Sequence, residues 1–386
     1  MDSAQRPRIG IDYTAAVHQR AGIGRYVRGL VAALAEHQPG VAAQLFVAGG
    51  GAVELPDTPA GFELRPSRLS ERTHARLWHR LRVPVPVEWW TGPLGLFHAT
   101  DFALPPTRPG TRTVLTVHDL AFERYPAETM PGMLGYLRRV VPRSVRRADH
   151  VITDSEATRR DVIELYHAAP EKVSVVYPGV SARFAAPQPP ERLAAVRRRY
   201  SLPDAPLVLT IGTMQPRKNH ARLVEAFARV APQTDAVLVV AGGKGWQYEA
   251  VHQLVERLGL AERVRFPGFV DDADLPALYA AAEVFAYPAL YEGFGLPVLE
   301  AMAAGTPVVT SAVSSLPEIT GEDGALLVDP ESVEQIAAAL ARLLADGALR
   351  ARLATHGTAR AQAFTWAATA EQLWDVYCHL LPELKG

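Results

Sequence analysis

Cysteine is almost absent from this sequence: among its 386 residues, only Cys378 carries a thiol. A single cysteine excludes an intramolecular disulfide and a cysteine metal cluster, and it is typical of a reducing compartment. Residues 1–13 contain no apolar signal core, and no apolar run approaches the roughly 20 residues of a membrane span. We therefore expect a globular protein of the cytoplasm.

Net charge is also small, at −1, but it is unevenly distributed. Residues 1–185 hold 23 Lys and Arg against 18 Asp and Glu, or +5, and the remaining residues hold 17 against 23, or −6. A chain of near-neutral charge whose arginines lack interleaved aromatics is a poor match for nucleic acid. The uneven split predicts that the two halves meet different partners.

Short apolar runs alternate with segments of helical periodicity through most of the chain. This alternation predicts α/β domains with parallel, doubly wound sheets. A proline-rich segment, 186–206, predicts a linker between a domain at 1–185 and a second domain at 207–365. The expected strands are 8–13, 44–48, 62–65, 96–100, 113–117, 149–155, 173–177, 207–211, 236–241, 264–266, 284–287, 307–310 and 325–328.

Residues 287–310, YPALYEGFGLPVLEAMAAGTPVVT, have the pattern of a strand end, a loop, a helix and a second strand. Gly293 and Gly295 leave the loop backbone free to approach a ligand closely. The helix is expected to begin at Leu296, because Pro297 suits its first turn. A glycine-rich loop that leads into a helix N-terminus favours an anion.

Two carboxylates, Glu292 and Glu300, flank this loop and would repel a phosphate. A carboxylate is a strong acceptor for paired hydroxyl donors. We therefore expect both glutamates to face sugar hydroxyls.

Other charged residues follow predicted strands, at the sheet edge where open α/β folds bind ligands. Arg217 and Lys218 come after strand 207–211 and suit a diphosphate. His118 follows strand 113–117 and predicts a ligand contact, while Asp119 caps or orients its loop. The loop after the first strand contains GIGR, which is weak evidence for a phosphate-binding loop. The arginine of this motif either contacts a phosphate or lies on the surface.

Three further polar stretches have two interpretations each. Asp272-Ala-Asp274 matches a metal-binding DxD, but it immediately precedes helix 275–282, so capping explains it better. Residues 67–90 are rich in Arg, His and Trp. They form either a surface that contacts the acceptor or a membrane, or an exposed helix whose arginine stems cover apolar surface. Helix 131–148 carries five arginines that bind an anionic lipid or a phosphorylated acceptor, or are simply solvated.

The intact string EGFGLPVLEAMAAGTPVV resembles the family-4 retaining glycosyltransferases of the GT-B fold. GIGRY, HDL and GGKGW are similar to motifs of bacterial polysaccharide mannosyltransferases. The resemblance spans nearly the whole chain. It implies two Rossmann-like domains facing a central cleft, with a C-terminal helix at 366–386 that crosses back to the first domain.

The resemblance also implies which residues act. The expected catalytic residues are His118, Glu292, Arg217 and Lys218. The expected donor-binding residues are Gly22, Gly24, Arg25, Gly212, Gly268, Phe269, Val270, Gly293, Phe294, Gly295, Leu296, Pro297 and Glu300. The family's commoner arginine position holds Thr213 here, so Arg217 takes that role by its chemistry. We expect no metal and no other cofactor, and we assign no protein nucleophile.

We accordingly expect a retaining, metal-independent hexosyltransferase that moves mannose from GDP-mannose to an acceptor hydroxyl in polysaccharide or glycolipid assembly. The acceptor is a glycan, a lipid-linked sugar or a small molecule, and the basic first domain would suit peripheral contact with the inner membrane face. UDP-glucose or UDP-GlcNAc is the alternative donor. A glycosyl phosphorylase would need a pyridoxal-phosphate lysine, and lysine is scarce. Paired glutamates argue against a non-catalytic, two-lobed sugar-binding protein.

Overall fold

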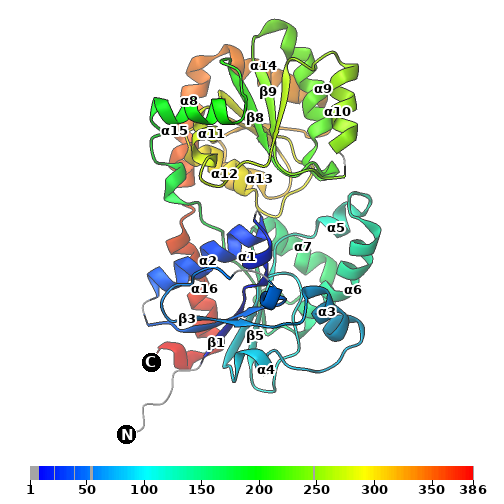
Figure 1. Ribbon diagram of the computed structural model, residues 1–386, viewed down its shortest axis with the longest axis vertical. Coiled ribbons are helices and arrows are strands. Elements are labelled where there is room, and N and C mark those ends of the chain that lie inside the picture. Colours follow the sequence, from blue (N-terminus) through cyan, green and yellow to red (C-terminus); the bar gives the residue numbers. More distant parts are fainter. Residues whose placement is uncertain (1–7, 21, 39, 53–54, 247, 386) are drawn as a thin grey trace. The chain divides into compact units, whose positions relative to one another are not determined.

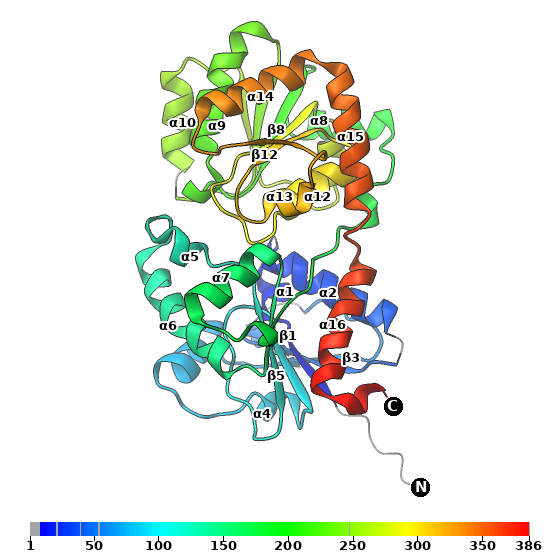
Figure 2. The same cartoon turned by 180° about the vertical axis from the view of Figure 1, so that it is seen from behind.

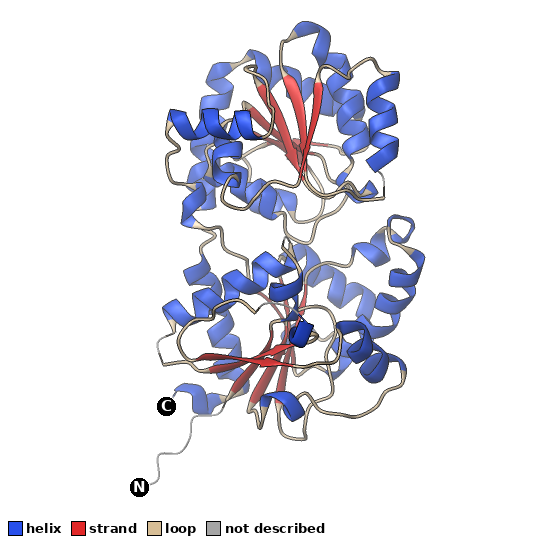
Figure 3. Cartoon of the chain, in the orientation of Figure 1, coloured by secondary structure: helices blue, strands red, loops and turns tan. Residues whose placement is uncertain are grey.

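A computed structural model describes residues 8–20, 22–38, 40–52, 55–246 and 248–385. The chain forms two compact units: unit 1 comprises Met1–Gly179 with Thr365–Gly386, and unit 2 comprises Val180–Phe364. Each unit contains a parallel β-sheet with helices on both faces (Figures 1 and 3). The prediction of two doubly wound, Rossmann-like domains is therefore confirmed.

The sheet of unit 1 has seven parallel strands in the order β3-β2-β1-β4-β5-β6-β7. Every strand expected in this half is present, with ends shifted by no more than two residues. The strand order reverses between β1 and β4, which makes their carboxyl ends a topological switch point. The strands are β1 (Ile9–Asp12), β2 (Ala43–Val47), β3 (Phe62–Pro66), β4 (Leu96–Ala99), β5 (Arg112–Val117), β6 (His150–Thr153) and β7 (Val173–Val175).

Two layers of helices cover this sheet because successive strand residues point to opposite faces. Ile9 and Ile11 pack with α2 and α16 on one face, whereas Phe97 and Ala99 pack with α6 and α7 on the other. The helices are α1 (Thr14–His18), α2 (Ile23–His37), α3 (Glu71–Ala75), α4 (Glu88–Thr91), α5 (Ala121–Arg124), α6 (Pro131–Arg147), α7 (Glu156–Tyr166) and α16 (Trp366–Leu380), with a π-helical turn at Arg76–Arg80.

The C-terminal helix α16 returns to unit 1 after the chain has formed unit 2, and it packs along α2 (Figure 2). Tyr377 of α16 is fully buried, and its hydroxyl lies 2.7 Å from Nδ1 of His98 on β4. At the other end of α16, the indole of Trp366 lies against Gly29 of α2. The expected crossing of the last helix back to the first domain is thus confirmed.

Gly29→Ala should weaken the packing of α16 on α2. A Cβ at this position would lie 2.3 Å from Cζ2 of Trp366, well inside van der Waals contact. Overpacking of this kind costs about 1–3 kcal/mol, and the better helix propensity of alanine offsets up to about 1 kcal/mol of it. We expect urea unfolding to show a net loss of stability. Gly135→Ala on α6, where a Cβ meets nothing within 4 Å, is the control and should not destabilise. Equal losses of stability for the two substitutions would contradict the close contact between Gly29 and Trp366.

The sheet of unit 2 has six parallel strands in the order β10-β9-β8-β11-β12-β13. All six expected strands of this half are present, and the order reverses between β8 and β11, which is the second topological switch point. The strands are β8 (Leu207–Ile211), β9 (Val237–Ala241), β10 (Val264–Gly268), β11 (Val284–Tyr287), β12 (Val308–Ser311) and β13 (Leu326–Val328).

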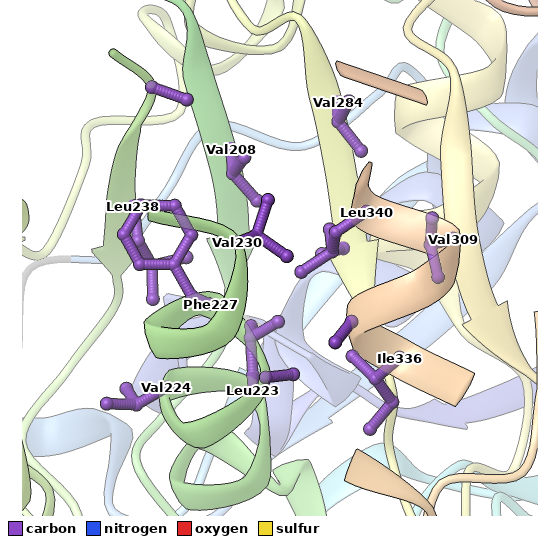
Figure 4. Close-up of a cluster of buried hydrophobic side chains, with 14 of the residues drawn as sticks. Val208, Leu223, Val224, Phe227, Val230, Leu238, Val284, Val309, Ile336 and Leu340 are labelled. Carbon is purple, nitrogen blue, oxygen red and sulfur yellow. The ribbon is translucent and has the colours of Figure 1, made fainter. Parts of the chain in front are cut away.

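Apolar residues at helical spacing explain how unit 2 covers this sheet. Leu223, Phe227 and Val230 lie on one face of α9, and Ile336 and Leu340 lie on one face of α14. Figure 4 shows these side chains meeting valines and leucines from β8, β9, β11 and β12 in one buried core. The helices are α8 (Pro190–Arg199), α9 (His220–Val230), α10 (Tyr248–Arg257), α11 (Leu275–Ala280), α12 (Leu296–Ala303), α13 (Leu316–Thr320), α14 (Val333–Ala345) and α15 (Gly347–Ala361).

Two segments differ from expectation. Residues 186–206, expected to be a linker, belong to unit 2, where α8 packs against α11. The loop expected at 14–24 contains the short helix α1. None of the described helices is both long and apolar enough to cross a bilayer.

Candidate functional site

The loops that follow β8 and β11 meet at the switch point of unit 2. The first contains residues 212–219 and the second contains residues 288–295. The Leu290 N–H donates to the Arg217 carbonyl at 2.8 Å, so the two loop backbones are directly joined. Because ligands of open α/β sheets bind beyond the carboxyl ends of strands at such points, this edge is the candidate site.

Asn219 fixes the cationic turn to this edge. It has a φ of +61°, a conformation that asparagine tolerates better than most residues. Its buried Nδ2 donates to the carbonyls of Pro288 at 2.8 Å and Pro330 at 2.7 Å. Asn219 was not singled out from the sequence. Its position directly after two cations and before a helix was the available signal for this role.

Arg217 and Lys218 converge on one carboxylate oxygen. Nη1 of Arg217 lies 2.9 Å and Nζ of Lys218 lies 2.7 Å from Oε1 of Glu292. The Tyr287 hydroxyl donates to the same oxygen at 3.1 Å and accepts from Lys218 at 2.5 Å. Tyr287 had no predicted role, because it lies within the apolar run of β11. Two cations against one carboxylate leave one net positive charge in this cluster.

The protonation states of this cluster follow from its surroundings. Burial would raise the pKa of Glu292, but the charges of Arg217 and Lys218 outweigh it and lower that pKa below its usual value. Burial raises the pKa of Tyr287 well above its usual range. Glu292 is therefore ionised and Tyr287 neutral at pH 7. This geometry gives Glu292 a positioning role for the two cations, and its contact with a sugar hydroxyl stays a prediction.

The EGFG loop is shaped by Gly295 and by two serines. Gly295 has a φ of +112°, and a Cβ there would lie 2.8 Å from Cδ2 of Leu316. Ser314 Oγ accepts from the Glu292 N–H at 3.0 Å, and Ser315 Oγ lies 2.9 and 2.6 Å from the carbonyls of Glu292 and Phe294. Both serines follow β12, and no local sequence pattern connects them with this loop.

Helix α12 begins at Leu296, as predicted, and Pro297 lies in its first turn. Glu300 lies about one turn further and is buried, and the Tyr279 hydroxyl donates to its Oε2 at 3.0 Å. The helix N-terminus and Glu300 are therefore presented by one short element. Binding of a ribose by Glu300 stays a prediction.

Glycines line the same edge of the sheet at β8, β9 and β10. A Cβ on Gly242 would lie 2.1 Å from the Gly212 carbonyl oxygen, and the Gly242 N–H donates to the Gly268 carbonyl at 2.8 Å. Of the two residues after Gly268, Phe269 is 45% exposed and Val270 is buried. A nucleotide base near this edge would meet the Phe269 ring, whereas Val270 offers only its backbone.

Gly22, Gly24 and Arg25 lie at the start of α2 in unit 1. Gly22 has a φ of +56° and precedes the helix. A Cβ on Gly24 would lie 2.0 Å from the Gln19 carbonyl oxygen, so close backbone packing alone requires this glycine. Arg25 is half-buried in the first turn of α2. The phosphate-binding role of this loop stays a prediction.

His118 follows β5 and is almost fully buried. Its Nδ1 lies 2.7 Å from Oδ2 of Asp154, and its Nε2 lies 2.8 Å from the Thr100 carbonyl oxygen. Burial would lower the pKa of His118, but the charge of Asp154 and their hydrogen bond raise it to about 9. His118 is therefore an imidazolium that donates from both nitrogens. A sugar hydroxyl could bind its ring nitrogens only by displacing one of these partners.

Asp274 is the N-cap residue of α11, but its carboxylate is occupied by donors from another helix. Its carboxylate is buried and accepts from Arg192 at 2.5 Å, Arg199 at 2.8 Å and Tyr200 at 2.8 Å, all from α8 or its end. Its side chain makes no cap hydrogen bond with α11, so the capping interpretation was wrong for Asp274. Instead, Asp274 attaches α8 to α11.

Two family models match the chain. Residues 20–184 match the model described as Glycosyltransferase Family 4, and residues 195–360 match Glycosyl transferases group 1. The O-antigen chain mannosyltransferase B of Escherichia coli is 35% identical over 284 residues, which cover 73% of this chain and 74% of that protein. A D-inositol 3-phosphate glycosyltransferase of Kineococcus radiotolerans is 35% identical over 308 residues, covering 75% and 69%.

Solved structures share the fold of the whole chain. Sucrose-phosphate synthase from Thermosynechococcus elongatus superposes with a TM-score of 0.78 at 24% identity, covering 98% of this chain and 100% of that one. At this level of identity the similarity establishes the arrangement of helices and strands within the fold, and nothing about substrates.

Proposed function

This chain belongs to the glycosyltransferases of group 1 and family 4, and on that premise we propose that it transfers a hexose from a nucleotide sugar to an acceptor hydroxyl with retention of configuration. Mannose from GDP-mannose is the preferred donor, because a mannosyltransferase is among the similar proteins and because GIGRY, HDL and GGKGW resemble mannosyltransferase motifs. UDP-sugars are the alternative donors.

The observation that carries this proposal is the cluster of Arg217 and Lys218 on Glu292. Cleavage of a sugar–phosphate bond places negative charge on the departing diphosphate. The net positive charge of this largely buried cluster, together with the N-terminus of α12, would stabilise that charge. Electrostatic partners held in place before the reaction need no reorganisation as the charge develops.

The other residues of unit 2 have supporting roles in this proposal. Glu300 accepts from the ribose hydroxyls, and Phe269 lies beside the base. The backbone of Phe294 and Gly295 contacts the donor. The acceptor oxygen forms a bond to the anomeric carbon as the bond to the phosphate oxygen breaks. The acceptor proton passes to the departing phosphate oxygen, so no protein nucleophile and no metal is assigned.

A panel of donors tests this proposal. Purified protein is incubated with GDP-mannose, UDP-glucose, UDP-GlcNAc and ADP-glucose, with and without acceptor, and nucleotide release is measured. We expect release from one donor class, fastest with GDP-mannose. If no nucleotide sugar is bound or turned over, the proposed function fails.

The variant Glu292→Gln sharpens the same assay. The amide keeps the size of the side chain but removes the charge that holds Arg217 and Lys218, so kcat should fall by about 10–100-fold. Glu334→Gln, at an exposed acid of the same unit, is the control and should not change kcat. Unimpaired turnover by Glu292→Gln would remove this carboxylate from the mechanism.

A further inference from the structure

Unit 1 contains a pocket of about 360 Å³ at its own switch point. Asp12, at the end of β1, and Asp101, just after β4, line it, and Glu71 from α3 lines it as well. Burial raises the pKa of Asp101 to about 6. Asp101 is therefore largely ionised at pH 7, and the three carboxyl groups make the lining of this pocket acidic.

The same pocket has features that suit an uncharged sugar ring. Aromatic rings of Trp78, Phe102 and Tyr136 line it beside the carboxylates. His74 is buried in its wall, and within the described part of the chain no partner lies within hydrogen-bond reach of its Nδ1. Carboxylates accept from hydroxyls, and aromatic rings cover the apolar faces of a ligand. A phosphate would be repelled here.

Two hollows that share lining residues with this pocket carry arginines instead of acids. His79 lines the acidic pocket and also two neighbouring hollows of about 300 and 530 Å³. The hollows lie between α6 and the turn at Arg76–Arg80. Their arginines are Arg76, Arg80, Arg82, Arg139, Arg143 and Arg147.

Most of these guanidinium groups lack a counterion. Arg147 donates to the carbonyls of Leu104 and Pro105, but the other five form no ion pair with any acid in the described ranges. Burial and the nearby charges of Arg82, Arg139 and Arg146 lower the pKa of Arg143. Mutually repelling arginines without acids are typical of a surface that binds phosphate.

We propose that the pocket and the two hollows together bind the acceptor, as a glycoside that carries a phosphate or diphosphate. The inference rests on the proposed function. The neutral sugar ring occupies the acidic pocket, and the phosphate lies outward among the arginines, because the reverse orientation would place phosphate against Asp12, Asp101 and Glu71. Both free sugar phosphates and lipid diphosphate sugars have this chemistry. Met133, which lines the pocket, is an exposed apolar residue, and so is Leu81, which lies between Arg80 and Arg82 in the sequence.

Matched acceptors test the proposal on the full-length protein. Mannose, glucose and N-acetylglucosamine are each offered as the methyl glycoside, as the 1-phosphate and as the diphosphate of a short prenyl alcohol. Transfer and binding are measured with the donor that the panel above identifies. We expect KM to be at least roughly ten-fold lower for the phosphate-bearing members than for the methyl glycoside of the same sugar. A still lower KM for the prenyl diphosphate would identify a lipid-linked sugar as the acceptor. Equal KM values for the 1-phosphate and the prenyl diphosphate would identify a free sugar phosphate.

Variants on α6 locate the effect. Arg139→Gln with Arg143→Gln should raise KM for phosphate-bearing acceptors by roughly ten-fold and leave methyl glycosides within about two-fold. Arg138→Gln is the matched control, because Arg138 lies on the same helix but pairs with Glu123 at 2.9 Å. Asp101→Asn should raise KM for both acceptor classes, with thermal unfolding used to check that each variant is folded.

The outcomes separate this inference from the proposed function. Donor binding in the absence of acceptor tests the transferase assignment alone. The inference is overturned if the donor binds but phosphate-bearing acceptors bind no better than methyl glycosides. It is overturned equally if the Arg139 and Arg143 variants keep the full preference, or if Arg138→Gln abolishes it.

Discussion

Lys218→Met is expected to lower kcat by about 10²–10³, the usual cost of removing one group that stabilises developing charge. Nζ of Lys218 is the more mobile of the two cations on Glu292, and methionine keeps the volume of the aliphatic stem. Arg217 remains within 2.9 Å of Glu292, so the carboxylate keeps one counterion. The free energy of unfolding should therefore fall by only about 1–2 kcal/mol. Single-turnover rates with saturating donor measure the effect.

An exposed cation of the same unit provides the control for Lys218. Arg229 pairs with Glu334 on the surface, and Arg229→Gln should leave both kcat and stability unchanged within about 0.5 kcal/mol. If Lys218→Met lost stability but retained kcat, the cation cluster would be a structural feature of unit 2 and not part of its chemistry.

Asp154→Ala should destabilise unit 1 by about 3–5 kcal/mol, because it leaves the buried His118 imidazolium without its counterion. The pKa of His118 is raised to about 9 in the folded chain, above its ordinary value of 6.5. Stability from a group of this kind is fully present below pH 6.5 and is lost as pH rises through 9. The difference in the free energy of unfolding between wild type and Asp154→Ala should accordingly be largest near pH 6 and smaller at pH 9.

Urea unfolding at pH 6 and pH 9 measures both parts of this expectation. Asp119→Ala is the control, because within the described residues Asp119 accepts a local hydrogen bond from the Ala121 N–H at 2.9 Å. This substitution should lower the free energy of unfolding by about 1 kcal/mol at either pH. A loss for Asp154→Ala that did not change with pH would show that His118 is neutral in the folded state.

Local sequence patterns were sufficient to predict the elements of both sheets. Runs such as Leu207–Ile211 and Val237–Ala241 are buried on both faces, as parallel strands are, and they appear in the sequence as unbroken apolar stretches. The loop after β11 and the start of α12 at Leu296 were predicted because glycine and proline have strong local preferences. Short helices such as α1 lack enough turns for periodicity to show.

Contacts between distant residues could not be predicted in this way. Lys218 and Glu292 are 74 positions apart, and His118 and Asp154 are 36 apart. Their pairing depends on which strands are neighbours in the sheet, and no local pattern specifies that order. The same reason explains why Asp12 and Asp101 were not singled out, although they lie at the carboxyl ends of β1 and β4, which prove to be neighbours in the sheet.

The return of α16 to unit 1 has a consequence for biosynthesis. The ribosome makes α2 early, but it makes α16, which covers one surface of α2, only after residues 180–364. At about 5–20 residues per second, that delay is roughly 10–40 s. During this interval Val27, Leu30 and Leu34 lack the contacts of Leu373 and Tyr377, so a nascent chain stalled before Thr365 is an expected substrate for chaperones and proteases.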